Sequence, residues 1–333
     1  MQNFCTLFDI NFISQGLVMY KSLLKYCNDD FMLYIFAFCE DSYKILKDLQ
    51  LKNAEIISVT ELEQKFPDLL SVKDSRTRGE YCWTCSSATI LYCLKEFNLG
   101  TCTYLDADLS FFANPKILID EIGDSSILLT EHRDAPIYDT KNICGKYCVQ
   151  FAFFRNDANG LEALNWWFNA CIGWCFNRIE DGRFGDQKYL DDWPTRFKGV
   201  HVLKHLGGGV APWNVPQYKI YYNKNRIFVK DNQQDVPIIF YHFQDIKPVD
   251  GNLIMDKSYK NSKAVKKLLY KPYIQNLIKE SQILHKKYKK VRVLKIPKFS
   301  LFNKINKFRQ NIIKFKFGKN GYLAILNKRF FEK

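Results

Sequence analysis

Short apolar runs alternate with amphipathic segments through the N-terminal third of the chain, and this alternation is the strongest constraint on the fold. The apolar runs predict strands at 4–9, 32–39 and 54–59, and a further strand that ends just before Asp106. The helical spacing of apolar residues predicts helices at 14–26, 42–51 and 79–97. Because parallel strands need crossover connections, usually helices, the pattern predicts an α/β fold with a mostly parallel sheet flanked by helices.

The middle of the chain continues this mixture of elements. Further strands are predicted at 126–130, 147–154 and 236–243, and an aromatic-rich helix at 160–177. We expect the three tryptophans of that helix region to pack in the core and not to stack on a substrate; they are Trp166, Trp167 and Trp174. The segment 181–193 is polar and punctuated by glycine, and the three glycines 207–209 predict a loop.

Two carboxylates one residue apart, Asp106 and Asp108, come directly after a predicted strand. Since side chains at i and i+2 share a face in an extended chain, both carboxylates can converge on one point. They repel each other unless a cation lies between them, and hard oxygen ligands suit Mg²⁺ or Mn²⁺ with positions open for phosphate. The other interpretation is a turn or a helix cap. Asp9 also follows a predicted strand, which favours a ligand site at this edge of the sheet.

The eleven cysteines do not predict a disulfide framework. Their number is odd, the chain is long, and the first residues lack the pattern of a signal peptide, so we expect free thiols in a reducing cytoplasm. Cys82-x-x-Cys85 has no second pair or nearby histidine, which disfavours a zinc site. No apolar run approaches the length of about 20 residues that a transmembrane helix needs.

The positive charge of the chain is concentrated at its C-terminal end. Residues 257–333 hold 23 of the 49 Lys and Arg but only two of the 35 acidic residues, so the remainder is net acidic. We therefore predict two parts, a catalytic domain at 1–250 and a basic, helical extension at 251–333. Lysines alternate with apolar residues at helical spacing in 263–288 and 305–317. An apolar stripe opposite the lysines is predicted in and just before the second of these helices, formed by Phe302, Ile305, Phe308, Ile312, Ile313 and Phe315.

The basic extension has three interpretations. A basic amphipathic helix is typical of an element that lies on an anionic membrane surface or associates with a partner. The same pattern fits a helix that packs on the domain with its basic face in solvent. Binding to nucleic acid is disfavoured, because the rest of the chain is net acidic.

Taken together, four segments resemble metal-dependent glycosyltransferases of the GT-A fold. These are CTLFDINF at 5–12, YLDADLSFF at 104–112, GDQKYL at 185–190 and YHFQ at 241–244. The chain is most similar to glycosyltransferase family 8 and to related bacterial enzymes of lipopolysaccharide or capsule synthesis. The resemblance spans roughly residues 3 to 245.

The resemblance implies roles for individual residues. Asp106 and Asp108 match the pair that binds Mn²⁺ and the donor diphosphate, and His242 matches the third ligand. An imidazole beside carboxylates favours Mn²⁺ over Mg²⁺. The implied donor-binding set is Phe8, Asp9, Asn11, Arg78, Asp106, Ala107, Asp108 and Lys247. The implied catalytic pair, beside the transferred sugar, is Asp186 and Gln187. Gln150 is the third catalytic candidate, in a segment where the family has an Asn-x-Gly strand, and it either takes a polar role facing the sugar or packs in the core.

Some positions depart from the family pattern. Ala211 precedes Pro-Trp where the family has a lysine, and Lys247 is a plausible substitute. His205 competes with His242 for the third ligand position, although His242 ends a predicted strand and has the better spacing. Arg76 and Arg78 precede Glu80 in the sequence. They are either positively charged side chains that attract the donor phosphates or an exposed pair on a loop. If configuration inverts, Asp186 or Asp191 is the candidate base.

The implied function is transfer of a hexose from a nucleotide-sugar, most simply a UDP-sugar, to a glycan acceptor in bacterial surface polysaccharide or lipopolysaccharide synthesis. The resemblance suggests retention of configuration. The implied location is the cytoplasmic face of the inner membrane, held there peripherally by the basic extension. Two alternatives come from other classes: a metal-dependent nucleotidyltransferase or phosphohydrolase, and a non-enzymatic protein that binds through its basic tail. The first would want a phosphate loop or a nucleophilic aspartate near the first strand, and Asp9-Ile10-Asn11 offers no such loop.

Overall fold

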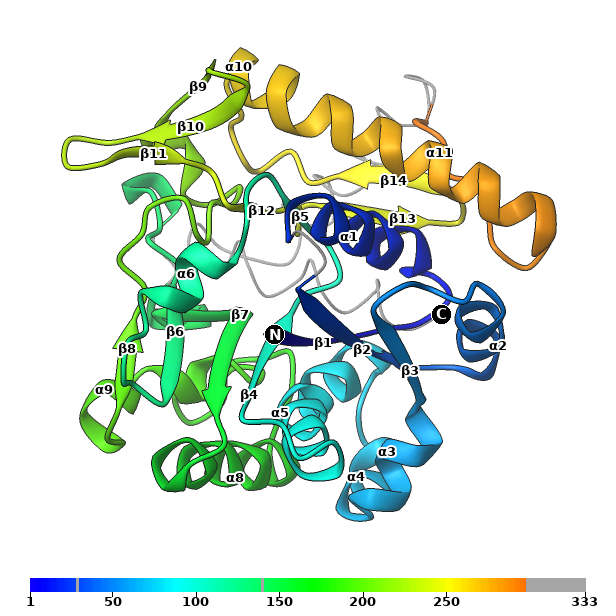
Figure 1. The fold of residues 1–333 in the computed structure, drawn as a ribbon, viewed down its shortest axis with the longest axis vertical. Helices are drawn as coiled ribbons and strands as arrows, with labels where there is room; N and C mark the ends of the chain where they lie inside the picture. The colour runs from blue at the N-terminus through cyan, green and yellow to red at the C-terminus, as the bar shows by residue number, and fades with distance from the viewer. Residues whose placement is uncertain (28–29, 139–140, 298–333) are drawn as a thin grey trace, which may run out of the picture.

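A mixed sheet of seven strands forms the centre of the computed structural model, which describes residues 1–27, 30–138 and 141–297 (Figure 1). The strand order is β3-β2-β1-β4-β7-β6-β8. The strands are β1 (Gln2–Phe8), β2 (Phe31–Ala37), β3 (Ala54–Ser58), β4 (Thr101–Leu105), β6 (Ile127–Glu131), β7 (Tyr147–Arg155) and β8 (Val200–Val202). The pairs β3-β2, β2-β1, β1-β4 and β6-β8 are parallel, whereas β7 runs antiparallel to both β4 and β6. The predicted α/β fold with a mostly parallel sheet is confirmed.

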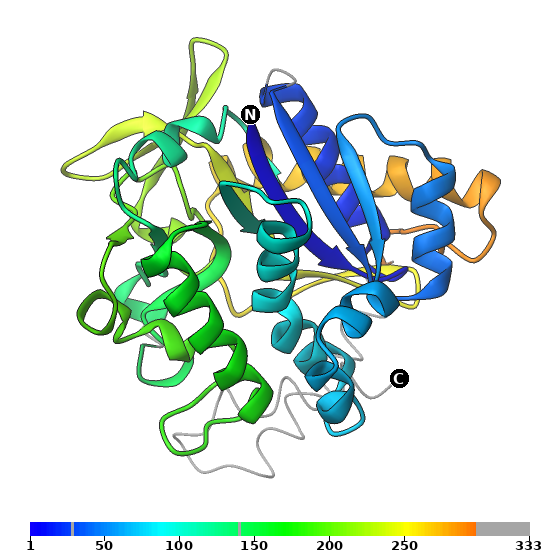
Figure 2. The ribbon, with the colours of Figure 1, turned by 60° about the horizontal axis from the view of Figure 1, so that its bottom comes forward.

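Helices cover both faces of this sheet (Figures 1 and 2). The longer helices are α1 (Ile13–Tyr26), α2 (Glu40–Asp48), α5 (Arg78–Glu96), α8 (Ala158–Gly173) and α11 (Lys271–Lys287). The shorter ones are α3 (Val59–Lys65), α4 (Asp68–Lys73), α6 (Lys116–Asp120), α7 (Lys141–Cys144), α9 (Trp193–Arg196) and α10 (Lys263–Val265). Short 3₁₀ turns occur at Pro136–Tyr138, Lys188–Leu190 and Val215–Gln217. The observed ends of the predicted helices differ from the expected ends by a few residues, as is usual where helix ends fray.

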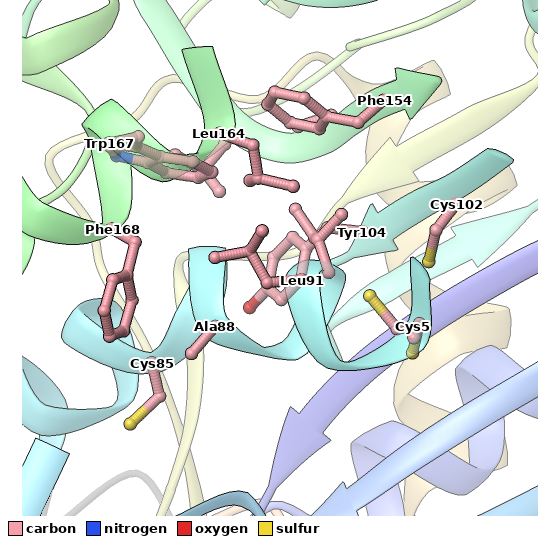
Figure 3. Close-up of a cluster of buried hydrophobic side chains, with 14 of the residues drawn as sticks. Cys5, Cys85, Ala88, Leu91, Cys102, Tyr104, Phe154, Leu164, Trp167 and Phe168 are labelled. Carbon is pink, nitrogen blue, oxygen red and sulfur yellow. The ribbon is translucent and has the colours of Figure 1, made fainter. Parts of the chain in front are cut away.

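Successive side chains of the strands pack in two separate hydrophobic cores, one on each face of the sheet. Cys5 and Leu7 of β1 belong to the core beneath α5 and α8, whereas Phe4 and Phe8 belong to the core beneath α1 and α2. This follows from the period of two along a strand, which sends successive side chains to opposite faces. In the first core, Trp167 stacks on Phe154 (Figure 3) and packs edge-to-face on Trp193. Trp167 and Trp174 are buried and Trp166 is partly buried against the same core, so the expectation of core tryptophans is confirmed.

All eleven cysteines lie in the described part of the chain and are free thiols. The absence of disulfides agrees with the expectation from the sequence. Cys82 and Cys85 belong to no group of metal-ligand side chains among the described residues. The sulfur atoms of Cys5, Cys93 and Cys102 do lie within 4.8 Å of one another, in the core between β1, β4 and α5. Cys5 and Cys102 are labelled in this core in Figure 3.

Three small antiparallel sheets accompany the large sheet in the described part of the chain, and two of them contain residues of the strand predicted at 236–243. In the first, β5 (Leu109–Phe111) pairs with β12 (Phe240–His242), so that Leu109 lies opposite His242. In the second, β9 (Lys219–Asn223), β10 (Arg226–Lys230) and β11 (Asp235–Pro237) form a meander. The single strand predicted at 236–243 is therefore wrong: β11 pairs with β10 and β12 pairs with β5, and the chain changes sheets at Ile238 and Ile239.

The first part of the basic extension is packed against the rest of the protein. Residue 250 lies in the turn between β13 (Ile246–Val249) and β14 (Asn252–Met255). A helix then runs from α10 through the π-helical segment Lys266–Tyr270 into α11, which packs along α1. The ring of Tyr273 on α11 stacks on Phe243 with 3.7 Å between centroids. This segment fits the interpretation of a helix packed on the domain with its lysines in solvent.

The second predicted helix, 305–317, and its apolar stripe lie outside the described residues. None of the helices within 1–27, 30–138 and 141–297 is both long enough and apolar enough to cross a bilayer.

A buried carboxylate joins the helical extension to the body. The Tyr270 hydroxyl donates to both oxygens of Asp245, at 3.0 and 2.9 Å, and lies 3.1 Å from the Tyr241 hydroxyl. Burial raises the pKa of Asp245 to about 7, even though the hydrogen bond from Tyr270 favours the charged form. The folded protein therefore holds this proton at pH values where the unfolded chain has released it.

We predict that Asp245 makes the folded state less stable as pH rises from about 4 to about 7, because a raised carboxyl pKa penalises ionisation in the folded state. In Asp245→Asn this contribution is absent, since the amide cannot ionise. The free energy of unfolding, measured by urea denaturation at pH 4.5 and 8, should fall less in the variant, by on the order of 3 kcal/mol. Identical pH dependence in both proteins would contradict the prediction.

Candidate active site

Two carboxylates and one imidazole meet beyond the carboxyl end of β4. Asp106 directly follows β4, Asp108 directly precedes β5, and His242 ends β12. The Nε2 atom of His242 lies 3.0 Å from Oδ1 of Asp108 and 3.5 Å from Oδ2 of Asp106. One ligand atom from each of the three residues lies within 4.8 Å of the others. The geometry therefore brings together the three residues that the sequence analysis named as metal ligands.

Backbone hydrogen bonds hold this constellation in place. The Asp106 amide donates to the Gln150 carbonyl at 3.1 Å, and the Leu109 amide closes a turn on the Asp106 carbonyl at 3.3 Å. The pairing of β5 with β12 then continues into a bond from the Phe243 amide to the Asp108 carbonyl, at 3.0 Å. Both strands that carry ligands are thus fixed to each other by main-chain bonds.

Burial and mutual charge set the protonation of this group. Burial raises the pKa of Asp106 to about 7, His242 opposes this rise, and Asp108 adds to it. Burial also acts to raise the pKa of Asp108, but the adjacent His242 outweighs it and the pKa is lowered. Burial acts to lower the pKa of His242, yet Asp108 raises it well above the ordinary value. Two carboxylates crowded together in this way favour a cation between them.

The donor set fits a divalent metal ion. Carboxylate oxygens suit Mg²⁺ and Mn²⁺, and an imidazole nitrogen in the same set favours Mn²⁺. The exposed fraction of the side chain is 29% for Asp106 and 15% for Asp108, so part of each carboxylate faces solvent. His242 is only 5% exposed, and its ring packs edge-to-face on Trp213 at 5.4 Å between centroids. The imidazole is held rigidly while the carboxylates remain accessible.

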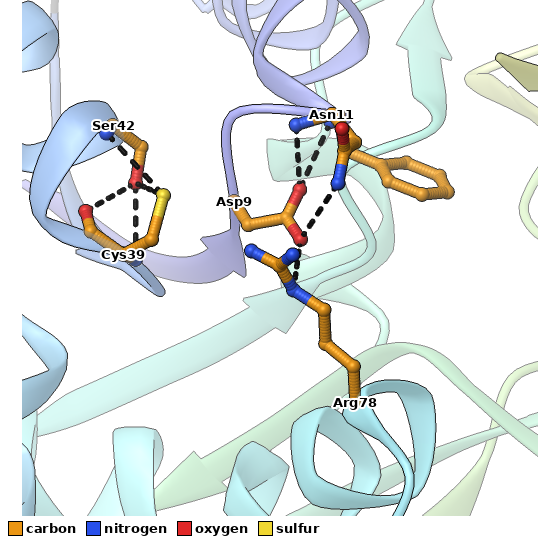
Figure 4. A network of polar contacts seen from close by, with 6 residues as sticks. Asp9, Asn11, Cys39, Ser42 and Arg78 are labelled. Atoms are coloured by element: carbon orange, nitrogen blue, oxygen red, sulfur yellow. Dashed lines mark hydrogen bonds and ion pairs between the residues drawn. The ribbon is translucent and has the colours of Figure 1, made fainter. Parts of the chain in front are cut away.

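A second polar group lies where β1 ends (Figure 4). Oδ1 of Asp9 accepts the amides of Asn11 at 2.7 Å and Phe12 at 3.3 Å, and Oδ2 forms an ion pair with Arg78. Arg78 is the first residue of α5, whose start is fixed by a capping box in which Thr77 and Glu80 bond reciprocally. Because β1 and β4 are adjacent and parallel, this group and the Asp106 group lie at the same edge of the sheet.

The predicted sugar-side residues come from two separate segments. Asp186 is buried, and burial together with the charge of Asp106 raises its pKa to about 8. Gln187 donates from Nε2 to the Cys144 carbonyl at 2.7 Å. Gln150 on β7 is completely buried, and neither its amide oxygen nor its amide nitrogen has a hydrogen-bond partner in the described structure. A buried, unsatisfied amide is costly and marks a position where a polar ligand would be stabilised.

The remaining predicted residues take different places. The Phe8 ring packs on α1 so closely that a Cβ at Gly16 would lie 2.3 Å from it, so Phe8 contributes to the core. Ala107 lies in the turn between the two aspartates. Lys247 is on β13, where burial lowers its pKa and the charge of Asp108 opposes this shift. His205 is not part of the metal-ligand group, and its Nδ1 accepts the Gly207 amide at 3.1 Å.

Two residues of the site were not predicted from the sequence. Trp213 fixes the His242 ring, as described above, and its indole Nε1 donates to the His132 carbonyl at 2.9 Å. Ser86 on α5 moderates the rise in the pKa of Asp186. The Pro-Trp pair at 212–213 was visible in the sequence, but nothing indicated which histidine it would contact. Ser86 looked like any polar residue of a helix.

We predict that the protein binds one Mn²⁺ ion at Asp106, Asp108 and His242. In Asp108→Asn one anionic oxygen ligand is lost, and we expect Mn²⁺ affinity to fall at least about tenfold. Mn²⁺ titration followed by electron paramagnetic resonance measures this without requiring activity. The matched control is Asp192→Asn, an exposed carboxylate that pairs with Arg196. Equal affinity in wild type and Asp108→Asn would contradict the prediction.

Two proteins of Bacillus subtilis (strain 168) are similar to this chain over most of its length. YfnD, an uncharacterized protein, is 31% identical over 289 residues, which cover 83% of this chain and 88% of YfnD. YfnF, also uncharacterized, is 30% identical over 259 residues, which cover 75% of this chain and 84% of YfnF. No protein-family model matches the chain.

Among solved structures, the apo structure of the bifunctional glycosyltransferase WbbM matches 83% of this chain and 49% of its own, with a TM-score of 0.51 and 11% sequence identity. An identity this low establishes a common fold but not a common substrate. The GT-A fold that the sequence resemblance implied is therefore confirmed. The chain belongs to the family of YfnD and YfnF, and it has the GT-A fold found in glycosyltransferases.

Proposed function

We propose that this protein is a metal-dependent glycosyltransferase that moves a hexose from a nucleotide-sugar, most simply a UDP-hexose, to a glycan acceptor. The observation that carries the proposal is the convergence of Asp106, Asp108 and His242 at the carboxyl edge of the sheet, in a glycosyltransferase fold. In open α/β sheets this edge is where ligands bind. The role in bacterial surface polysaccharide or lipopolysaccharide synthesis is part of this proposal and rests on the sequence resemblance alone.

The metal site has a defined part in this proposal. Asp106, Asp108 and His242 would hold the ion. A bound Mn²⁺ or Mg²⁺ supplies Lewis-acid stabilisation of the charge that grows on the donor diphosphate as the glycosidic bond breaks. The chain itself supplies a preorganised frame, since the β5–β12 pairing fixes the ligands before a donor arrives.

The remaining donor contacts come from the same edge. Asp9, with its oxygens oriented by Asn11 and Arg78, is suited to hydrogen-bond the nucleoside. Lys247, whose pKa is influenced by the charge of Asp108, is suited to the phosphates, and Ala107 lies in the turn between the two aspartates. Arg78 is about half exposed, so its guanidinium can reorient toward a phosphate without leaving a buried charge.

For the sugar side of the site we propose retention of configuration, as the sequence resemblance suggests. Gln150 is buried without partners, so its amide is available to a sugar hydroxyl. Asp186 and Gln187 lie on one segment, and we assign them to orienting the transferred sugar. In a retaining reaction the departing phosphate can take the acceptor proton, so no separate base is required. Asp191, the alternative base, is occupied: its oxygens accept from the Lys146 amide at 2.6 Å and pair with Lys188 at 2.7 Å.

For the location we infer a peripheral association with the cytoplasmic face of the membrane, where a lipid-linked acceptor would lie. The support is compositional: residues 298–333 hold ten Lys and Arg against one acidic residue. Basic segments of this kind are attracted to anionic lipid. Residues 257–297 are less suited to that role, because Tyr273 and Leu277 of α11 are buried in the body.

We predict that the purified protein releases UDP from a UDP-hexose in a metal-dependent reaction. A screen of UDP-glucose, UDP-galactose and UDP-N-acetylglucosamine with Mn²⁺ should identify at least one substrate, and EDTA should abolish turnover. In Asp108→Asn the rate should fall at least about a hundredfold, because charge on the leaving group is no longer neutralised. Asp192→Asn should retain the wild-type rate. UDP release that is indifferent to both EDTA and Asp108→Asn would refute the proposed chemistry.

We also predict that the full chain binds vesicles containing phosphatidylglycerol at low ionic strength. Binding should be lost at about 0.5 M salt, because the attraction is screened. A chain ending at residue 297 keeps the packed α11 and should not bind. Sedimentation with vesicles of pure phosphatidylcholine is the control. Salt-insensitive binding, or binding by the shortened chain, would exclude this role for the tail.

A further inference from the structure

The strand that carries His242 is short and has few bonds of its own. β12 has three residues and lies in a sheet of two strands, paired with β5. An isolated pair of strands is marginally stable in water, because little buried surface offsets the entropy lost when it is ordered. The Val210 carbonyl adds one bond, from the His242 amide at 2.9 Å. These bonds lie in the plane of the strand, so they do not fix the face that points away from the site.

The side chains next to His242 point away from the site and into the C-terminal extension. Successive side chains of an extended chain alternate faces, so Tyr241 and Phe243 lie opposite His242. Both are completely buried, in a core that they share with Tyr270 and Tyr273 of the extension. The ring of Tyr270 packs on Tyr241 and Phe243 at 5.8 and 5.5 Å between centroids, and Tyr273 stacks on Phe243. The extension therefore covers the back of the strand that carries the imidazole.

One hydroxyl of the extension joins the residues before and after His242. Tyr270 donates to both carboxylate oxygens of Asp245, at 3.0 and 2.9 Å, and its oxygen lies 3.1 Å from the Tyr241 hydroxyl. Because Tyr270 is the donor to Asp245, its oxygen can accept the Tyr241 proton. The bonded series Tyr241–Tyr270–Asp245 thus spans His242. All three side chains are buried, where hydrogen bonds are strong and their loss is costly.

The backbone that leads to Tyr270 has a rare geometry. Residues Lys266–Tyr270 form a π-helical segment between α10 and α11. Such segments close their hydrogen bonds one residue later than an α-helix does, and they are found mostly at functional sites. A continuous α-helix would present a different face to Asp245. The π-helical segment therefore contributes to the alignment of the Tyr270 hydroxyl.

The neighbouring Tyr273 separates the effect of burial from that of hydrogen bonding. Tyr273 is 3% exposed and Tyr270 is 2% exposed, and both rings pack on Phe243. The Tyr273 hydroxyl, however, has no hydrogen-bond partner among the described residues. The two tyrosines of the extension thus differ in the bonds of their hydroxyls and not in their burial.

We propose that Tyr270 is a positioning residue for the active site: its hydroxyl holds Tyr241 and Asp245 so that the His242 imidazole stays against the two carboxylates. The packed part of the extension is then a component of the catalytic unit and not an appendage. The consequence for metal binding rests on the proposed metal site. The placement of the imidazole does not, because it concerns the ring in the metal-free protein.

The test removes one hydroxyl at a time from the full chain. Tyr270→Phe deletes the bonds to Asp245 and Tyr241 and keeps the ring. Tyr241→Phe is a milder variant, because Asp245 keeps its donor. The matched control is Tyr273→Phe, which deletes a buried hydroxyl that makes no hydrogen bond in the described structure. Thermal denaturation checks that each variant is folded at the temperature of the measurements.

Two quantities are measured. The first is the affinity for Mn²⁺, by electron paramagnetic resonance. The second is the position of the His242 imidazole signals in a ¹H–¹³C correlation spectrum of the metal-free protein, assigned with the variant His242→Gln. The second quantity reports the surroundings of the ring and does not depend on any activity.

We expect Tyr270→Phe to bind Mn²⁺ about tenfold more weakly than wild type, as is usual when a residue that orients a metal ligand is lost. Tyr241→Phe should bind about threefold more weakly, because one hydrogen bond is lost. The His242 signals should move in both variants. Tyr273→Phe should match wild type in both measurements.

The positioning role is overturned if the His242 signals are unchanged in Tyr270→Phe, or if Tyr273→Phe moves them equally. If the signals move but Tyr270→Phe binds Mn²⁺ as wild type does, the consequence for metal binding is overturned. Wild type that binds no Mn²⁺, with signals that respond as expected, would support the positioning of the ring and refute the metal site instead. If Tyr270→Phe does not fold, the same criteria apply to Tyr241→Phe.

Discussion

The antiparallel pairing of β5 with β12 is the interaction on which the site depends. It joins two segments 130 residues apart, with Leu109 opposite His242, and it sets the imidazole against the two carboxylates. No side-chain attraction alone would do this, since a histidine on a free loop would lose more conformational entropy than one ion pair returns. Main-chain hydrogen bonds between β5 and β12, and the packing of Phe240 against Phe111 and Phe151, offset this loss of conformational entropy before a metal binds.

The two cores on either side of the large sheet explain why charged groups can gather at its edge. Each face of β1 and β4 is covered by helices, so the strands are held by apolar packing and not by the residues that follow them. Asp9 and Asp106 come after the last paired residues of their strands. Polar side chains directly after the strand ends disturb little of the hydrophobic packing. Their arrangement can therefore serve ligand binding without a loss of core stability.

Much of the fold and part of the site followed from local patterns. Period-two strands and amphipathic helices predicted the order of the strands and longer helices in the first hundred residues, but not the short helices α3 and α4. The positions of Asp9 and Asp106 after strands predicted the edge at which they lie. The strand predicted at 236–243 was wrong, because an apolar run does not reveal that its two halves pair with different partners. The place of α11 along α1 was equally hidden, since a basic amphipathic pattern fits a membrane, a partner helix or the protein's own body.

The sequence by itself determined which chemistry was available: two carboxylates one residue apart, a late histidine, and an acidic body with a basic end. These features depend only on residue types and on short spacings along the chain. They can therefore be read from the sequence without knowing which distant segments are in contact. Only the tertiary structure decided that His242 and not His205 meets the aspartates, and that Gln150 is buried without a hydrogen-bond partner among the described residues. Each depends on contacts between distant segments, which strand pairing and burial specify and local sequence does not.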